Sequence, residues 1–150
     1  MGRKLVMGLA LVMGLALPAA AVAGSRGFSG SFENGQGQVL FELDTKNNGK
    51  QEVVDYQFVD VPLDCKGDAE TTTGIIELGI KVKNSKFADT FTLGSDKNPK
   101  LKIKVEGKFV SDNASSGTFS IKGRKVPLNG GGAKKCKSGS LDWSATVFAR

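Results

Sequence analysis

Apolar residues recur at every second position along most of this chain, and this spacing limits it to β-strands more strictly than any other feature. In the segment 39–43, for example, Val39, Phe41 and Leu43 share one parity. Because successive side chains of a strand point to opposite faces, such a segment buries one face and exposes the other. No stretch after residue 23 keeps a helical period. The alternation therefore predicts an all-β chain.

Turn residues divide these alternating segments into eight or nine short strands. Asn48-Gly49 and Asn84-Ser85 are typical hairpin turns, and Pro62 is expected to end the strand that starts near residue 52. A further long strand is expected over 72–83. The buried sides of these two strands are expected to carry Val54, Tyr56 and Phe58, and Ile76, Leu78, Ile80 and Val82. The spacing predicts an antiparallel β-sandwich or barrel of about eight or nine strands.

The N-terminus is typical of a cleavable export signal. Arg3 and Lys4 precede an apolar run of 13 residues, and Ala21-Val22-Ala23 fits the rule for signal peptidase cleavage. A bilayer-spanning helix needs about 20 apolar residues, so this run is too short to be one. The sequence therefore predicts a signal peptide over residues 1–23 and a single β domain over 24–150. The mature chain has no second apolar segment long enough to span a membrane, so we expect a secreted or envelope-associated protein.

The two cysteines allow only one intrachain pairing. In an oxidising compartment an even cysteine count indicates a disulfide, which predicts a bond between Cys65 and Cys136. Trp143 follows the second cysteine, whereas an immunoglobulin domain has its tryptophan between the two. Trp143 shares parity with Leu141 and Ala145, so we expect it in the core.

The absence of histidine narrows the chemistry. It removes the commonest general base and the commonest metal ligand. The segment 44–55 resembles a calcium loop, but Lys46 stands where an oxygen ligand is required. The sequence therefore predicts no metal, no cofactor and no catalytic residue. A carboxylate-based glycan hydrolase stays open as an alternative, because two acids at a suitable separation are sufficient for that reaction.

Charge is distributed unevenly along the chain. Residues 24–79 hold 4 bases and 10 acids, whereas residues 80–150 hold 15 bases and 5 acids. If residues 80–109 form a three-stranded meander, one outer face carries Lys81, Lys83, Lys100, Lys102 and Lys104 beside Thr90 and Thr92. Such a face predicts binding to an anionic wall polymer or polysaccharide. The same lysines also fit a simpler interpretation, in which they keep the protein soluble and protect sheet edges.

Other partners fit the sequence less well. Aromatic residues do not alternate with these lysines, so the face lacks the stacking platform of a nucleic-acid binder, and we expect no nucleic-acid partner. A barrel for a small apolar ligand is a second alternative, with its cavity lined by Phe41, Phe58, Phe91 and Trp143.

The C-terminal half carries a recurrent pattern. Gly107-Lys108-Phe109 and Gly117-Thr118-Phe119 are followed by Cys-x-Ser-Gly-x-Leu-x-Trp-x-Ala, which spans residues 136–145 and follows the basic pair Lys134-Lys135. This pattern resembles that of a group of small secreted bacterial all-β proteins of unknown function with one disulfide. The resemblance supports a secreted β-protein and transfers no site residue. We therefore expect a non-catalytic binding or structural module at or outside the cell surface.

Overall fold

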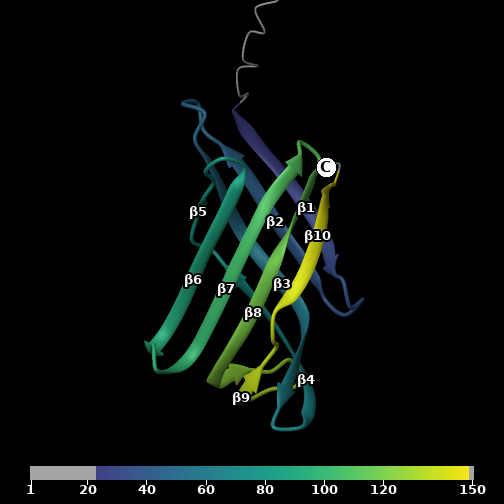
Figure 1. Ribbon diagram of the computed structural model, residues 1–150, viewed down its shortest axis with the longest axis vertical. Helices are drawn as coiled ribbons and strands as arrows, with labels where there is room; N and C mark the ends of the chain where they lie inside the picture. The colour runs from purple at the N-terminus through teal and green to yellow at the C-terminus, as the bar shows by residue number, and fades with distance from the viewer. Residues whose placement is uncertain (1–22, 149–150) are drawn as a thin grey trace, which may run out of the picture.

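The structure is a computed structural model that describes residues 23–148 and contains ten strands there (Figure 1). The strands are β1 (Gly24–Phe32), β2 (Gln38–Thr45), β3 (Gln51–Cys65), β4 (Asp68–Ile76), β5 (Ile80–Lys81), β6 (Lys86–Ser95), β7 (Asn98–Ser111), β8 (Ala114–Pro127), β9 (Ala133–Lys137) and β10 (Leu141–Val147). Apart from its last residue, the expected signal peptide lies outside the described residues. Within those residues, no helix is long and apolar enough to cross a membrane.

All ten strands belong to one antiparallel sheet that closes on itself. The hydrogen-bonded order is β10-β1-β2-β3-β9-β8-β7-β6, and β8 also pairs with β10. The strands β10, β1, β2, β3, β9 and β8 thus form a closed ring, while β4 and β5 pair with β3. The predicted class, an all-β antiparallel sandwich or barrel, is confirmed, with ten strands instead of the expected eight or nine.

The closed sheet encloses one aromatic core between a front and a back layer of strands. In Figure 1, β6, β7, β8 and β10 lie in front of β1, β2 and β3. Phe41 of β2 joins the layers, because its ring lies 5.9 Å from that of Phe87 and 5.7 Å from that of Trp143. Trp143 is 1% exposed, which confirms its predicted place in the core. Phe58 is also buried, with its ring 4.9 Å from that of Phe119, whereas Phe91 is only partly buried at the margin of the core.

Two β-bulges in β3 change the parity that the sequence suggested. The pairing registers with β2 and β4 each shift once, near Asp55 and Asp60, which have φ values of 50° and 52°. An extra residue in one strand reverses the faces beyond it. Val53 is therefore buried and Val54 only half-buried, so the predicted burial of Val54 is wrong. Tyr56 and Phe58 are buried as predicted.

Two expected element boundaries are also wrong. Pro62 does not end its strand, because β3 continues through it to Cys65. The single strand expected over 72–83 is instead two strands, β4 and β5, with a break at residues 77–79. Leu78 lies in this break and is 68% exposed, whereas Ile76 and Ile80 on either side are buried as predicted.

Glycines in β7 and β8 leave room for the core rings. Gly107 and Gly117 lie directly opposite each other in the β7–β8 pair. A Cβ atom at Gly107 would overlap the ring of Phe87, and one at Gly117 would overlap Trp143 and the Glu106 carbonyl oxygen. Larger residues here would displace the aromatic core.

Candidate anion-binding face

The outer side of β7 carries three of the predicted lysines. Lys100, Lys102 and Lys104 alternate along this strand with inward residues, of which Ile103 and Val105 are buried. On the neighbouring strand β6, Thr90 lies opposite Lys104 and Thr92 opposite Lys102. The structure therefore brings these three lysines together beside Thr90 and Thr92, as the alternation predicted.

A row of like charges crosses this face from strand to strand. Lys102 of β7 lies opposite Lys122 of β8, and Lys122 lies opposite Lys137 of β9. We call Lys102, Lys122 and Lys137 the lysine row. Side chains directly opposite one another on a sheet have Cβ atoms about 5 Å apart, where like charges destabilise the fold. Within residues 23–148, none of these three ammonium groups forms an ion pair.

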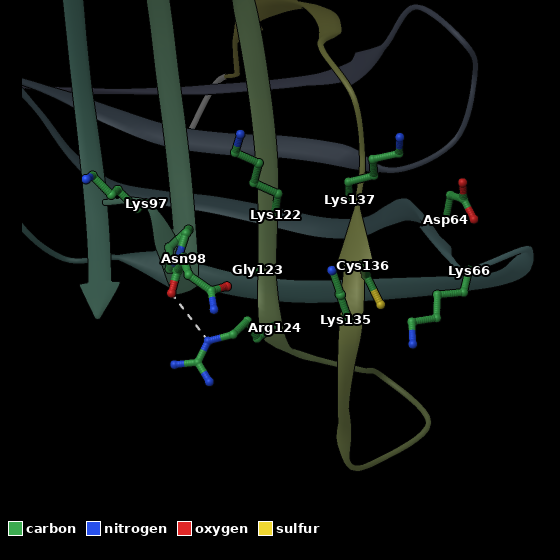
Figure 2. A pocket seen from close by; sticks show the side chains of 11 residues that line it. Asp64, Lys66, Lys97, Asn98, Lys122, Gly123, Arg124, Lys135, Cys136 and Lys137 are labelled. Atoms are coloured by element: carbon green, nitrogen blue, oxygen red, sulfur yellow. Dashed lines mark hydrogen bonds between the residues drawn. The ribbon is translucent and has the colours of Figure 1, made fainter. Parts of the chain in front are cut away.

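The lysine row ends in a hollow of about 540 Å³ (Figure 2). We call it the basic hollow. Its charged lining consists of Lys66, Lys97, Lys122, Arg124, Lys135 and Lys137, with Asp64 as the one carboxylate. Figure 2 shows Lys122 and Lys137 extending the same way from neighbouring strands. A concave surface with one sign of charge concentrates counter-ions, so the basic hollow is suited to holding an anion.

Hydrogen bonds fix two polar side chains of the basic hollow. The Asp64 carboxylate accepts a hydrogen bond of 2.8 Å from the Gly67 backbone N–H, within the turn from β3 to β4. Arg124 donates its Nε–H to the Asn98 backbone carbonyl at 3.3 Å, which leaves its two terminal nitrogens facing other directions.

The disulfide connects the two walls of the basic hollow. Cys65 and Cys136 are bonded, as the sequence predicted, and both are almost fully buried. Cys65 stands between Asp64 and Lys66, and Cys136 stands between Lys135 and Lys137. The cross-link therefore holds the β3–β4 turn against β9.

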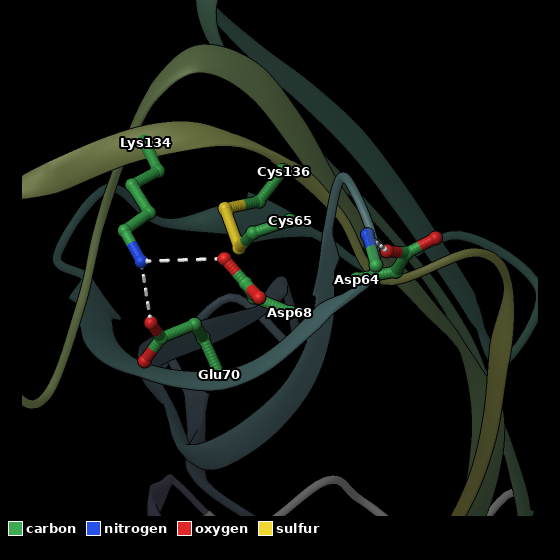
Figure 3. A network of polar contacts seen from close by, with 7 residues as sticks. Asp64, Cys65, Asp68, Glu70, Lys134 and Cys136 are labelled. Carbon is green, nitrogen blue, oxygen red and sulfur yellow. Dashed lines mark hydrogen bonds and ion pairs between the residues drawn. A yellow bond between two sulfur atoms is a disulfide. The ribbon is translucent and has the colours of Figure 1, made fainter.

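The opposite side of β9 shows a neutralised lysine. Lys134 Nζ lies 2.8 Å from Glu70 Oε1 and 3.9 Å from Asp68 Oδ2, next to the disulfide (Figure 3). The hydrogen bond from Lys134 to Glu70, aided by the charge of that carboxylate, raises the pKa of Lys134. The nearby acids of β4 thus pair with Lys134, not with the cations of the basic hollow.

The remaining predicted lysines lie apart from the lysine row. Lys81 of β5 lies opposite Glu52 of β3, and Lys83 forms an isolated bridge with Lys86. The expected meander over residues 80–109 is therefore incomplete, since β5 pairs with β3 while β6 pairs with β7. Lys81 and Lys83 line a separate hollow with Asp89 and Glu106.

A second cross-strand row on the same outer face is acidic. Glu106 of β7 lies opposite Thr118 of β8, which lies opposite Asp142 of β10. We call Glu106, Thr118 and Asp142 the acidic row. Lys104 Nζ lies 2.8 Å from Glu106 Oε1 and donates a hydrogen bond to it, which lowers the pKa of Glu106. Lys104 is therefore partly neutralised.

The acidic row bears on the hydrolase alternative. Glu33, Glu106 and Asp142 line a shallow hollow of about 350 Å³. A glycosidase needs one carboxylic acid with a raised pKa to protonate the leaving group. The pKa of Glu106 is instead lowered, so this residue is unsuited to that role. Among the described residues, no three His, Cys, Asp or Glu side chains gather to hold a metal.

The sequence did not reveal how far the cationic surface extends. It indicated Lys100, Lys102 and Lys104, but Lys122 and Lys137 join them only through the pairing of β7, β8 and β9. In the sequence, Lys134, Lys135 and Lys137 form one basic segment, but in β9 Lys135 and Lys137 face the basic hollow and Lys134 faces the other side. Strand alternation could have predicted this division, because it places Lys134 and Lys135 on opposite faces.

Known proteins add no further assignment to this face. No family model, no curated protein and no solved structure matches the chain.

Proposed function

We propose that this protein is an exported, non-catalytic module that binds an anionic polysaccharide or wall polymer through the lysine row. The observation that carries the proposal is the placing of Lys102, Lys122 and Lys137 directly opposite one another with no ion pair among the described residues. This arrangement is unfavourable in the free protein, and a bound polyanion would relieve the repulsion.

The spacing of the cations suits a polymer. Neighbouring strands lie about 4.8 Å apart, and alternate residues along a strand lie about 6.7 Å apart. The lysine row therefore runs across the strands, while Lys100 and Lys104 extend it along β7. Because lysine is a hydrated, flexible point charge, such a face would hold successive charges of a chain without strict geometry.

Export is part of the same proposal. The N-terminal pattern at residues 1–23 is that of a cleavable signal, and the Cys65–Cys136 disulfide is of the kind that persists in oxidising compartments. The resemblance to secreted bacterial β-proteins agrees with it. The proposed site of action is thus the cell surface or the extracellular medium.

The test compares two variants with the same loss of charge. The row variant replaces Lys102, Lys122 and Lys137 by Gln. The control variant replaces Lys50, Lys81 and Lys83 by Gln. Fluorescence anisotropy with a labelled heparin oligosaccharide measures affinity at several salt concentrations. In the row variant, the slope of log affinity against log salt concentration should become less negative by about two to three. The reason is that each missing lysine contact means nearly one counterion fewer released on binding.

Two outcomes would contradict the proposal. Equal slopes for the row variant and the control variant would assign binding to net charge alone. Affinity for a DNA duplex as high as that for heparin would instead identify nucleic acid as the partner.

A further inference from the structure

The basic hollow has a composition that the lysine row alone does not explain. It adds four cations to Lys122 and Lys137, and each comes from a different part of the chain. They are Lys66 from the β3–β4 turn, Lys97 from the β6–β7 turn, Arg124 from β8 and Lys135 from β9. We propose that the basic hollow is a subsite for a dianionic phosphate monoester on a sugar. Because the phosphate monoester would be a group of the polymer that the lysine row binds, this inference rests on the proposed function.

The charge in the basic hollow is not balanced by the protein. In the part of the chain that the structure describes, none of its six cations forms an ion pair. Its one carboxylate, Asp64, lies opposite Lys137 in the β3–β9 pair and accepts a hydrogen bond from the Gly67 backbone N–H, so it offsets at most one of the six positive charges. Nearby acids exist, but Asp68 and Glu70 pair with Lys134 on the other side of β9. An external anion is the missing counter-charge.

The number of cations favours phosphate over other anionic groups. A phosphate monoester carries a charge of about −1.5 to −2 at neutral pH, with three acceptor oxygens. A sulfate ester or a carboxylate carries a single charge, so it would gain less from several nearby cations. Arg124 adds a planar donor group whose orientation is set by the bond from its Nε–H to the Asn98 carbonyl.

The size and rigidity of the basic hollow suit a sugar phosphate. Its volume of about 540 Å³ falls within the usual range of small-molecule sites. The Cys65–Cys136 bond fixes the wall that carries Lys66 relative to the wall that carries Lys135. A site that is already formed loses less entropy on binding.

Isothermal titration calorimetry with glucose 6-phosphate, inorganic phosphate and glucose 6-sulfate tests the inference. Glucose 6-phosphate should bind at one site per chain, and at least fivefold more tightly than glucose 6-sulfate. Its affinity should fall severalfold from pH 7.5 to pH 5, because the phosphate takes up its second proton near pH 6 and loses part of its charge. Inorganic phosphate binding as tightly as glucose 6-phosphate would show that the ligand is free phosphate, and would overturn the sugar assignment.

A matched pair of variants locates the site. Lys66→Gln with Lys135→Gln should weaken glucose 6-phosphate binding at least tenfold, whereas Lys50→Gln with Lys81→Gln should leave it unchanged. Neither pair alters the lysine row. An absence of saturable binding, or an equal loss in both pairs, would overturn the inference.

The two proposals fail in different ways. If heparin binding depends on the lysine row but glucose 6-phosphate does not bind, the basic hollow is not a phosphate site and the proposed function stands. If glucose 6-phosphate binds in the basic hollow but heparin binding does not depend on the lysine row, the phosphate site stands and the polymer proposal fails.

Discussion

The acidic row and the lysine row occupy the same outer face of β7 and β8, only four residues apart along β7, yet their charges are treated differently. In the acidic row, Glu106 is paired with Lys104 and hydrogen-bonded to Thr118. In the lysine row, three cations stand opposite one another without an ion pair among the described residues. The difference shows that this fold can neutralise a surface lysine where an acid is within reach.

The comparison separates two explanations of the positive charge. Lysines that only keep a protein soluble need no particular neighbours, so their placement should be scattered. Here seven cations are collected in one row and one hollow, while Glu106, four residues along β7 from Lys102, is paired with Lys104. Charge that is concentrated in this way acts on a ligand more strongly than the same charge spread over the surface.

The largest expected effect concerns the core that both rows share. Trp143 lies beneath the acidic row and contacts Phe41, Tyr56 and Phe87. Trp143→Ala should lower the free energy of unfolding by about 3–5 kcal/mol, because it leaves a large cavity among packed rings. Urea denaturation followed by circular dichroism measures this loss.

The same variant tests whether heparin binding by the lysine row depends on the core beneath the acidic row. Below its unfolding transition, Trp143→Ala should bind heparin with unchanged salt dependence, because no charge has moved. A loss of binding as large as that of the row variant would show that the lysine row depends on the core beneath the acidic row. Red-shifted, readily quenched tryptophan fluorescence in the native protein would contradict the buried position of Trp143.

The next largest effect is expected from removing the disulfide, which joins the walls of the basic hollow and does not touch the acidic row. Replacing Cys65 and Cys136 by Ser should lower the free energy of unfolding by about 2–5 kcal/mol, because the cross-link restricts the unfolded chain over a separation of 71 residues. Strand content should be retained, since β9 still pairs with β8 and β3. Differential scanning calorimetry measures the stability.

Binding measurements on this variant sharpen the comparison. Glucose 6-phosphate affinity should fall, because the walls of the basic hollow are no longer joined. The ion pair of Lys104 with Glu106 should be unaffected, since it lies on β7 away from the bond. Two free thiols found by labelling the denatured, unreduced protein would show that the bond does not form.

Strand parity carried most of what the sequence could predict. It placed Val39, Phe41 and Leu43 inside and Lys100, Lys102 and Lys104 outside, because a regular strand alternates without reference to the rest of the fold. It failed in β3, where the bulges near Asp55 and Asp60 each add one residue. Both aspartates adopt left-handed backbone angles that sequence alone does not specify.

The candidate site could be predicted only in part, because it depends on pairing between distant strands. Lys122 lies 20 positions after Lys102 and 15 before Lys137, and nothing local in the sequence sets these registers. The basic hollow also needs the β3–β4 turn to be held beside β9. The disulfide indicated that proximity, since Lys66 and Lys135 each adjoin a bonded cysteine.

The smallest expected effect comes from releasing Lys104. Because the hydrogen bond and charge of Lys104 lower the pKa of Glu106, its carboxylate is charged at neutral pH and stays so until the pH falls below the usual value of 4.5. Glu106→Gln should therefore raise heparin affinity at pH 7 by about two- to threefold, a gain typical of one exposed charge pair. Glu77→Gln, in the exposed break between β4 and β5, is the control with the same change in net charge.

The pH dependence gives this prediction its sign. Lowering the pH through the depressed pKa of Glu106 protonates the wild-type carboxylate and frees Lys104, while the sulfates of heparin remain charged. The difference in heparin affinity between wild type and Glu106→Gln should therefore vanish at low pH. A difference that persists there, or an equal gain from Glu77→Gln at pH 7, would mean that Glu106 does not hold Lys104 back from the ligand, and the two rows would then act independently.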